Sequence, residues 1–142
     1  MIKIYTDGAC KGNPGKGGWG ALIQLGGESI EIFGGELNTT NNRMELIAVI
    51  EALDKVKAEP SRVMVFTDST YVQKGISEWI LNWKKNGWRS SSKQPVKNQD
   101  LWMRLDELKQ GMTIEWNWVK GHAGHPENER ADFLANQGVE SI

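Results

Sequence analysis

The amino-acid sequence predicts an α+β or mixed α/β domain built around one central sheet, with its elements in the order β-β-β-α-β-α-α-β-α. Apolar and polar residues alternate with a period of two in the first third of the chain, which is typical of strands. From Met44 the apolar residues recur at helical spacing, and short apolar runs then separate further helical stretches. The length of 142 residues fits one domain, and the whole of residues 1–142 is expected to form it.

The first third is predicted to form a meander of three antiparallel strands. Residues 2–7 alternate in polarity, and the glycine-rich residues 8–20 predict a turn region. Alternation resumes from Trp19 to Leu25, Gly26-Gly27 predicts a tight turn, and Ile30–Phe33 marks a third strand.

The other elements follow from the same periodicities. Apolar runs bounded by turn residues predict strands, and i, i+3, i+4 spacing predicts helices. The sequence predicts a helix from Met44 to about Ala58, a strand at Val63–Phe66, a helical stretch after Ser69 through Trp79 and Trp83, a helix at Leu101–Leu108 ended by Gly111, a strand at Ile114–Val119, and a helix from Pro126 through Leu134.

Composition excludes several classes of protein. With 17 basic and 18 acidic residues the formal net charge is −1, which argues against a basic coat over the whole surface. The single cysteine, Cys10, excludes an internal disulfide and a cysteine-rich zinc site. No targeting segment or membrane-spanning apolar run is recognisable, so a cytosolic protein is expected, without a membrane partner.

Three sequence motifs fail on their context. Residues 15–20 match G-x-G-x-x-G, but a strand is predicted to follow where dinucleotide binding needs a helix. The Walker A pattern also fails, because Gly18 stands where lysine is required. His122 and His125 with one cysteine cannot complete a structural zinc site.

Two aspartates follow or end predicted strands. Asp7 lies in or at the end of what should be a central strand, where aspartate is disfavoured; the alternative is that it caps the following turn. Asp68 follows the apolar run at Val63, at the carboxyl end of a strand, where open sheets place ligand sites. Its alternative role is the N-cap of the next helix.

Two further acids lie near predicted helix starts. Asn42 and Glu45 have capping-box spacing, so Glu45 fits a helix start as well as a functional site. Asp132 taken singly fits a solvated helix face.

The four acids say more together than singly. Carboxylates that meet at one end of a sheet repel one another, and a divalent cation relieves that repulsion. Oxygen ligands select Mg²⁺ or Mn²⁺, and two such ions about 4 Å apart serve phosphoryl displacement. The group therefore indicates chemistry on phosphates.

Several segments together resemble bacterial type 1 ribonuclease H. They cover nearly the whole chain in order: Thr6-Asp7-Gly8, Gly12-Asn13-Pro14-Gly15, Thr39 to Glu45, Thr67-Asp68-Ser69, and Val119 to Asp132. The resemblance implies a ribonuclease H fold, a five-stranded mixed sheet with helices on both faces. It also implies hydrolysis of the RNA strand of RNA–DNA hybrids by a two-metal mechanism, leaving 3′-hydroxyl and 5′-phosphate ends.

The resemblance also assigns roles residue by residue. Asp7, Glu45, Asp68 and Asp132 match the metal-binding carboxylates of the family, and His122 matches its catalytic histidine. Cofactors are then two Mg²⁺ ions with substrate, with Mn²⁺ as a substitute. Cys10, Asn13 and Asn42 match positions that contact the hybrid, and Thr40, Asn41 and Asn98 are expected on the DNA-strand side. A monomer is expected.

A tryptophan-rich basic segment follows at about residues 79–97. It holds Trp79, Trp83 and Trp88 with Lys84, Lys85, Arg89, Lys93 and Lys97. Aromatic rings interleaved with basic residues favour contact with nucleic acid. The alternative is that Trp79 and Trp83 pack one face of their helix into the core, with the basic residues solvated on the other face. We expect both in part; in the family this region grips the DNA strand. Trp19, Trp102, Trp116 and Trp118 are expected in the core.

Two other functions remain open: a hybrid-binding module that does not cut, and an ATP-using member of the same broad fold. The complete carboxylate set argues against the first, and the length leaves no room for the second lobe of the other. Residues 74–97 carry six bases and one acid, a local charge of +5, so the remainder sums to −6. The near-neutral total therefore combines a basic segment expected to contact the DNA strand with acidic residues expected to bind cations.

Overall fold

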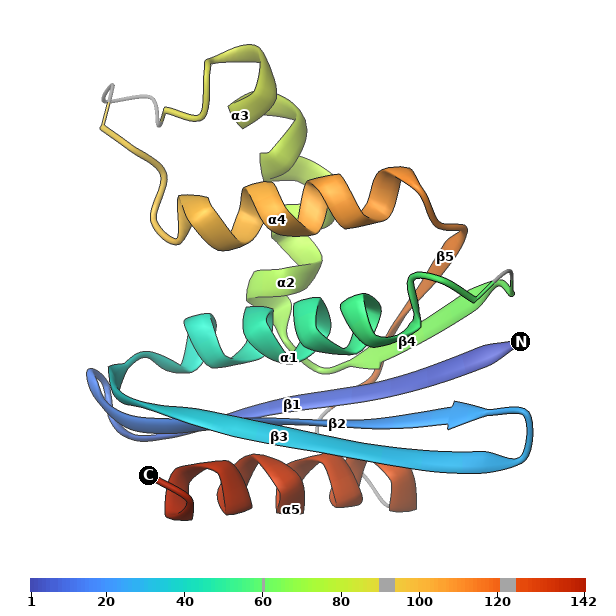
Figure 1. Cartoon of the computed structure of the whole chain (residues 1–142). Helices are drawn as coiled ribbons and strands as arrows, with labels where there is room; N and C mark the ends of the chain where they lie inside the picture. Colours follow the sequence, from blue (N-terminus) through green and yellow to red (C-terminus); the bar gives the residue numbers. More distant parts are fainter. Residues whose placement is uncertain (60, 90–93, 121–124) are drawn as a thin grey trace.

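The computed structural model describes residues 1–59, 61–89, 94–120 and 125–142, and its centre is a mixed five-stranded sheet (Figure 1). The strand order is β3-β2-β1-β4-β5. β1 pairs antiparallel with β2, and β2 with β3, whereas β4 runs parallel to both β1 and β5. The strands are β1 (Ile2–Gly12), β2 (Gly15–Leu25), β3 (Glu28–Thr39), β4 (Val63–Thr67) and β5 (Ile114–Trp118).

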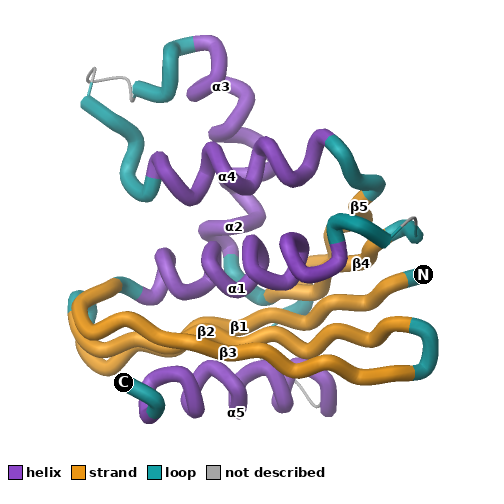
Figure 2. The backbone as a smooth tube through the Cα atoms, in the orientation of Figure 1, coloured by secondary structure: helices purple, strands orange, loops and turns teal. Residues whose placement is uncertain are grey.

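Helices cover both faces of this sheet, as predicted (Figure 2). α5 lies against β1, β2 and β3 on one face, and α1 lies on the other face with α4 packed against it. The helical segments are α1 (Asn41–Val56), α2 (Thr70–Lys74), the π-helical turn η1 (Gly75–Trp79), α3 (Ile80–Lys85), α4 (Gln99–Gln110) and α5 (Pro126–Glu140). No helix in the described part of the chain is long and apolar enough to span a membrane.

The predicted turn region at residues 8–20 is wrong. β1 runs through Gly12 and β2 begins at Gly15, so only two residues separate the strands. The glycines serve close packing instead: a Cβ on Gly18 would lie 2.1 Å from the backbone oxygen of Ala135 in α5. Gly26 and Gly27, by contrast, form the predicted turn, with φ of 55° and 85° that glycine adopts without strain.

Several predicted helix boundaries also move. α1 begins at Asn41 because the Thr40 side chain accepts a hydrogen bond from the Arg43 amide and caps the helix. The stretch after Ser69 is helical as expected but contains the π-helical turn, where Gly75 lies directly against the Trp102 ring. The final helix extends beyond Leu134 to Glu140.

Most of the core lies between the sheet and the α1–α4 layer. It combines β1 and β4 side chains such as Ile4 and Val65 with the apolar face of α1 and with Trp102 of α4. Trp102 is fully buried, as predicted. Trp116 and Trp118 are half-buried and pack against this core, so the core assignment holds for them in part. Trp19 is only half-buried, and for this residue the core assignment is wrong.

The close approach of α5 to β2 gives a first prediction. Gly18→Ala should lower the free energy of unfolding by about 1–3 kcal/mol, because the added methyl overlaps backbone atoms that cannot move independently. Denaturant unfolding measures this. Gly111→Ala is the matched control, since its methyl meets no atom within 4 Å and should change stability by less than about 0.5 kcal/mol. Equal effects of the two substitutions would contradict the packing argument.

Candidate metal centre

Asp7 lies in the middle of β1, where it pairs with Gly20 of β2 and is only 4% exposed. Its Oδ1 accepts a hydrogen bond of 2.9 Å from the Gly8 amide. The chain continues as a strand for five residues beyond Asp7, so it does not cap a turn. The aspartate at this buried strand position is therefore not explained by a turn or cap, and its neighbours in space have to account for it.

Glu45 reaches the same backbone amide from the other side of the cleft. It lies near the start of α1 and its Oε1 accepts from the Gly8 amide at 3.1 Å. Thr40 provides the helix cap, so the capping-box interpretation of Asn42 and Glu45 is wrong. A Cβ at Gly8 would lie 2.8 Å from the Glu45 nitrogen, so glycine permits α1 to approach β1 this closely.

Asp68 follows β4 directly, as predicted. β4 runs parallel to β1 with Phe66 beside Tyr5, which brings the residues after both positions to one region of the sheet. The helix cap is Ser69, whose Oγ accepts from the Val72 amide at 3.1 Å. The interpretation of Asp68 as that cap is therefore wrong.

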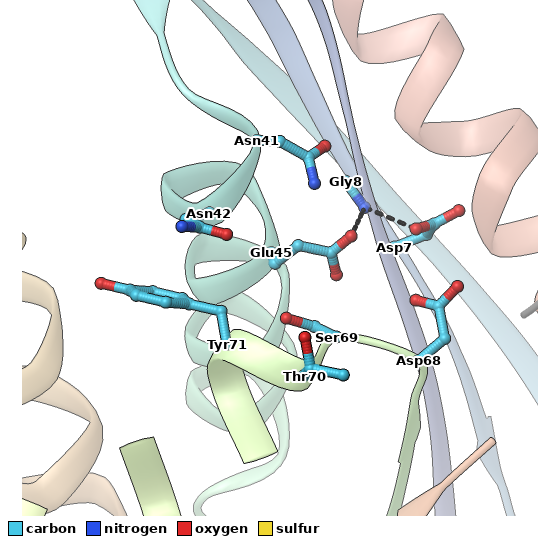
Figure 3. Close-up of a pocket in the computed structure, with 9 residues that line it drawn as sticks. All are labelled: Asp7, Gly8, Asn41, Asn42, Glu45, Asp68, Ser69, Thr70 and Tyr71. Atoms are coloured by element: carbon cyan, nitrogen blue, oxygen red, sulfur yellow. Dashed lines mark hydrogen bonds between the residues drawn. The ribbon is translucent and has the colours of Figure 1, made fainter. Parts of the chain in front are cut away.

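Asp7, Glu45 and Asp68 form one cluster, with one oxygen from each carboxylate within 4.8 Å of the others. The three carboxyl groups come together beside the middle of β1 (Figure 3). They line an open cleft of about 300 Å³ together with Gly8, Asn41, Asn42, Ser69, Thr70 and Tyr71.

Burial and mutual repulsion disfavour ionisation of this cluster. The pKa of Asp7 rises to about 7, mainly through desolvation and then through the charge of Asp68, although the Gly8 amide opposes the rise. The pKa of Glu45 is raised well above its ordinary value, again mainly by burial and then by the charges of Asp7 and Asp68. A cation in the cleft would favour the ionised forms.

Asp132 lies on α5, on the opposite face of the sheet from α1. It is half-buried and outside the cluster of three, but a side-chain hydrogen bond with Asp7 contributes to the raised pKa of Asp7. The structure thus brings the fourth predicted carboxylate beside the first. His122 lies outside the described residues.

The donor set fits a divalent cation. Glu45 Oε2 is buried, and no donor in the described part of the chain lies within hydrogen-bonding distance of it. Buried carboxylate oxygens without a protein donor are costly unless a cation or a proton compensates them. An all-oxygen set of this kind suits hard ions and does not suit zinc or copper.

Known proteins are similar to this chain in sequence and in fold. The RNase H family model matches residues 1–140. The ribonuclease H of Thiobacillus denitrificans is 66% identical over 139 residues, which cover 98% of this chain and 93% of that protein. The chain belongs to the ribonuclease H family.

Solved structures agree with this membership. LC9-RNase H1, a type 1 RNase H with the type 2 active-site motif, has a TM-score of 0.86 and 35% identity, with 99% of this chain and 72% of that chain covered. LC11-RNase H1 in complex with an RNA/DNA hybrid has a TM-score of 0.71 and 26% identity, with coverage of 99% and 98%. This ribonuclease H is a metal-dependent endoribonuclease that cleaves RNA in RNA–DNA hybrids.

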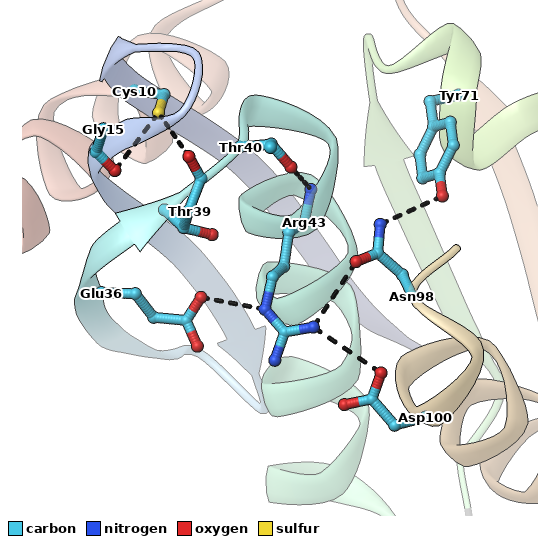
Figure 4. Close-up of polar contacts among 9 residues, drawn as sticks. All are labelled: Cys10, Gly15, Glu36, Thr39, Thr40, Arg43, Tyr71, Asn98 and Asp100. Atoms are coloured by element: carbon cyan, nitrogen blue, oxygen red, sulfur yellow. Dashed lines mark hydrogen bonds and ion pairs between the residues drawn. The ribbon is translucent and has the colours of Figure 1, made fainter. Parts of the chain in front are cut away.

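Two of the residues predicted to contact substrate line the cleft of this ribonuclease H, and others contact the start of α1 or the end of β3. Asn41 and Asn42 line the cleft at the start of α1. Asn13 Oδ1, in the turn between β1 and β2, accepts from the Asn41 amide at 3.2 Å. Cys10 Sγ contacts the backbone oxygens of Gly15 and Thr39 (Figure 4) and also that of Gly12.

The aromatic residues of the basic segment form a continuous row. Ring centroids lie 5.8 Å apart for Trp79 and Trp83 and 6.3 Å apart for Trp83 and Trp88. All three rings are half-buried. The alternative that Trp79 and Trp83 pack into the core holds for Trp83 and not for Trp79, and Trp88 packs against the core as well. Each of the three rings therefore keeps part of its surface exposed to solvent.

The lysines of this segment differ in their contacts within the protein. Lys84 forms an ion pair of 3.2 Å with Asp106 of α4. Lys85 and Lys97 are exposed. Lys93 lies outside the described residues.

Sequence reasoning missed Tyr71 and Arg43. Tyr71 lines the cleft and lies 5.6 Å from the Trp79 ring, in an edge-to-face arrangement. Arg43 connects α1 to Glu36 of β3 and to Asp100 of α4. The position of Tyr71, three residues after Asp68 in the first turn of a helix, was the available signal for it.

The raised pKa of Asp7 predicts how the metal-free protein responds to pH. Its carboxyl is protonated more readily in the folded state than in the unfolded chain, where the pKa is about 3.9. Asp7 therefore contributes stability at about pH 4 that is lost as the pH rises through about 7.

Asp7→Asn removes this titration. In chelator the variant should match the wild type near pH 4 and exceed its stability at pH 8 by several kcal/mol, with about 4 kcal/mol as the ceiling for a shift of this size. Denaturant unfolding at both pH values measures the difference. A constant difference between variant and wild type across the range would contradict the prediction.

Proposed function

We propose that this ribonuclease H hydrolyses the RNA strand by a two-metal mechanism, with two Mg²⁺ ions held by Asp7, Glu45, Asp68 and Asp132. The products would carry 3′-hydroxyl and 5′-phosphate ends, and Mn²⁺ would substitute for Mg²⁺. The whole chain acts as a single catalytic domain and as a monomer in this proposal.

The observation that carries the proposal is the convergence of three carboxylates within 4.8 Å of one another in an open cleft. Their oxygens, with Asp132 beside Asp7, provide ligands from β1, α1, the end of β4 and α5. Bound divalent ions supply an activated water and stabilise charge on the leaving oxygen.

The chain itself holds the cluster in place. The Gly8 amide donates to both Asp7 and Glu45, which fixes the two side chains against each other. Glu45 is expected to contact a ribose 2′-hydroxyl as well, because this group distinguishes RNA from DNA at a given site. His122 is proposed to assist proton transfer or product release.

Cleavage assays with four labelled substrates test the proposal. With Mg²⁺, the wild type should cut the RNA strand of a hybrid and leave duplex RNA, single-stranded RNA and duplex DNA intact. Chelation of the metal should abolish cleavage. Absence of hybrid cleavage, or equal cutting of all four substrates, would overturn the proposal.

The ligand role of Asp7 has its own test. Asp7→Asn should reduce hybrid cleavage by at least about a thousandfold, since an amide cannot replace an ionised ligand, while hybrid binding remains within about threefold. Asp54→Asn is a matched control, because Asp54 is half-buried and pairs with Lys57 and Arg104 away from the cleft. An Asp7→Asn enzyme that cuts at near wild-type rate would contradict the role.

The basic segment is proposed to hold the DNA strand through its exposed lysines and its aromatic row. Lys85 and Lys97 are available for phosphates, whereas Lys84 is engaged with Asp106. Each phosphate contact adds to the salt dependence of binding.

Lys85→Ala with Lys97→Ala should weaken hybrid binding and lower the slope of log K against log salt by about 1–2. Binding is measured on the Asp7→Asn background so that the hybrid is not cut. Lys84→Ala should change the slope less, and Lys57→Ala, which removes an ion pair on α1, should leave it unchanged. An unchanged slope in the double variant would mean that these lysines form only a solvated face.

A further inference from the structure

Asn98 combines an unusual backbone with a side chain held from two sides. It is the N-cap of α4 with φ 57° and ψ 32°, the left-handed region that few residues other than glycine adopt. Asparagine at an N-cap normally caps the helix with its side chain, but this one makes no such bond. Asparagine adopts this region more readily than most residues other than glycine, and its side chain is used for contacts with other elements.

The side-chain amide is instead held between two residues of other elements (Figure 4). Its Nδ2 donates to the hydroxyl of Tyr71 in α2 at 3.2 Å. Its Oδ1 accepts from Nη1 of Arg43 in α1 at 3.5 Å. The amide therefore lies between the two elements that begin at the carboxylate cleft.

This arrangement allows only one orientation of the amide. The Arg43 guanidinium can only donate, so the oxygen of Asn98 must face it. The Tyr71 hydroxyl also accepts from Trp102 Nε1 at 3.0 Å, and that indole can only donate. The nitrogen of Asn98 consequently faces Tyr71. Among the residues that the structure describes, no second acceptor contacts this nitrogen, so its other N–H can donate to a bound molecule.

Arg43 and Tyr71 are themselves fixed. Arg43 Nε donates to Glu36 of β3 at 3.0 Å, and its Nη1 lies 3.6 Å from Asp100. With two carboxylates beside it, the guanidinium carries little excess charge for a phosphate. Tyr71 is anchored through Trp102, which is fully buried under Gly75.

We infer that Arg43 and Tyr71 are positioning residues that orient the Asn98 amide, so that its remaining N–H donates to the bound DNA strand. The inference rests on the proposed substrate contact of Asn98. Neither positioning residue touches the reacting phosphate in this scheme, so both act on the binding of hybrid and not on the chemical step.

A double-mutant cycle on hybrid cleavage tests the inference. Asn98→Ala should raise KM about tenfold with kcat changed less than twofold, as expected for one lost hydrogen bond to a charged acceptor. Tyr71→Phe and Arg43→Lys should each raise KM about three- to fivefold, since the amide is no longer held in one orientation. In the Asn98→Ala background both substitutions should change KM by less than about 1.5-fold.

Two controls separate orientation from stability. Tyr71→Phe leaves the Trp102 N–H without its acceptor and lowers stability, so thermal unfolding of each variant is measured beside the kinetics. Arg43→Lys keeps the charge and tests the same link if Tyr71→Phe does not fold. Arg104→Lys, at an arginine paired with Asp54 outside the cleft, should leave KM unchanged.

The outcomes are distinct. Wild type that does not cut hybrid refutes the proposed function, and an Asn98→Ala variant with normal KM refutes the substrate contact and this inference with it. If Asn98→Ala raises KM but the effects of Tyr71→Phe and Arg43→Lys are as large in its background as in the wild type, the positioning role is wrong. A loss of kcat with unchanged KM would also overturn it.

Discussion

The shared hydrogen bonding of Asp7 and Glu45 to one backbone amide, that of Gly8, is the interaction on which the rest of this structure depends. It draws α1 against the middle of β1, and only a residue without a Cβ permits this approach. Two carboxylates thereby enter a buried environment that opposes their ionisation. Ionisation of these two carboxylates in the folded protein is therefore unfavourable, and a bound divalent cation would compensate their negative charge.

The topology of the sheet supplies the other members of the centre. Parallel pairing of β4 with β1 carries the chain to Asp68 beside Asp7. Close packing of α5 on the glycines of β2 brings Asp132 to Asp7 from the opposite face. The same glycines that weaken a strand in isolation are therefore required for the distance between α5 and the sheet.

A second set of interactions connects the centre to the basic segment. Arg43 links α1 with β3 and α4, and Tyr71 links the rim of the cleft to the buried Trp102. Trp83 and Trp88 extend this aromatic packing toward the exposed lysines. The net charge of −1 is thus the sum of an acidic centre and a basic segment, which have opposite charge. Aromatic contacts and ion pairs connect these two regions.

The sequence by itself determined the order of the elements, the turn at Gly26-Gly27 and the strand before Asp68, because periodicity and residue chemistry are local signals. It also singled out the three acids that the structure brings together as a cluster. Only the tertiary structure decided that residues 8–20 are mostly strand, since several glycines there serve contacts with distant elements. Gly8 lies against α1, and Gly18 and Gly20 lie against α5, which is more than a hundred residues away in the chain. It also decided that α1 is capped by Thr40 and not by Asn42, whose spacing to Glu45 had suggested a capping box. Tyr71 and Arg43 gain their roles from contacts with Asn98, and no local pattern encodes such a contact.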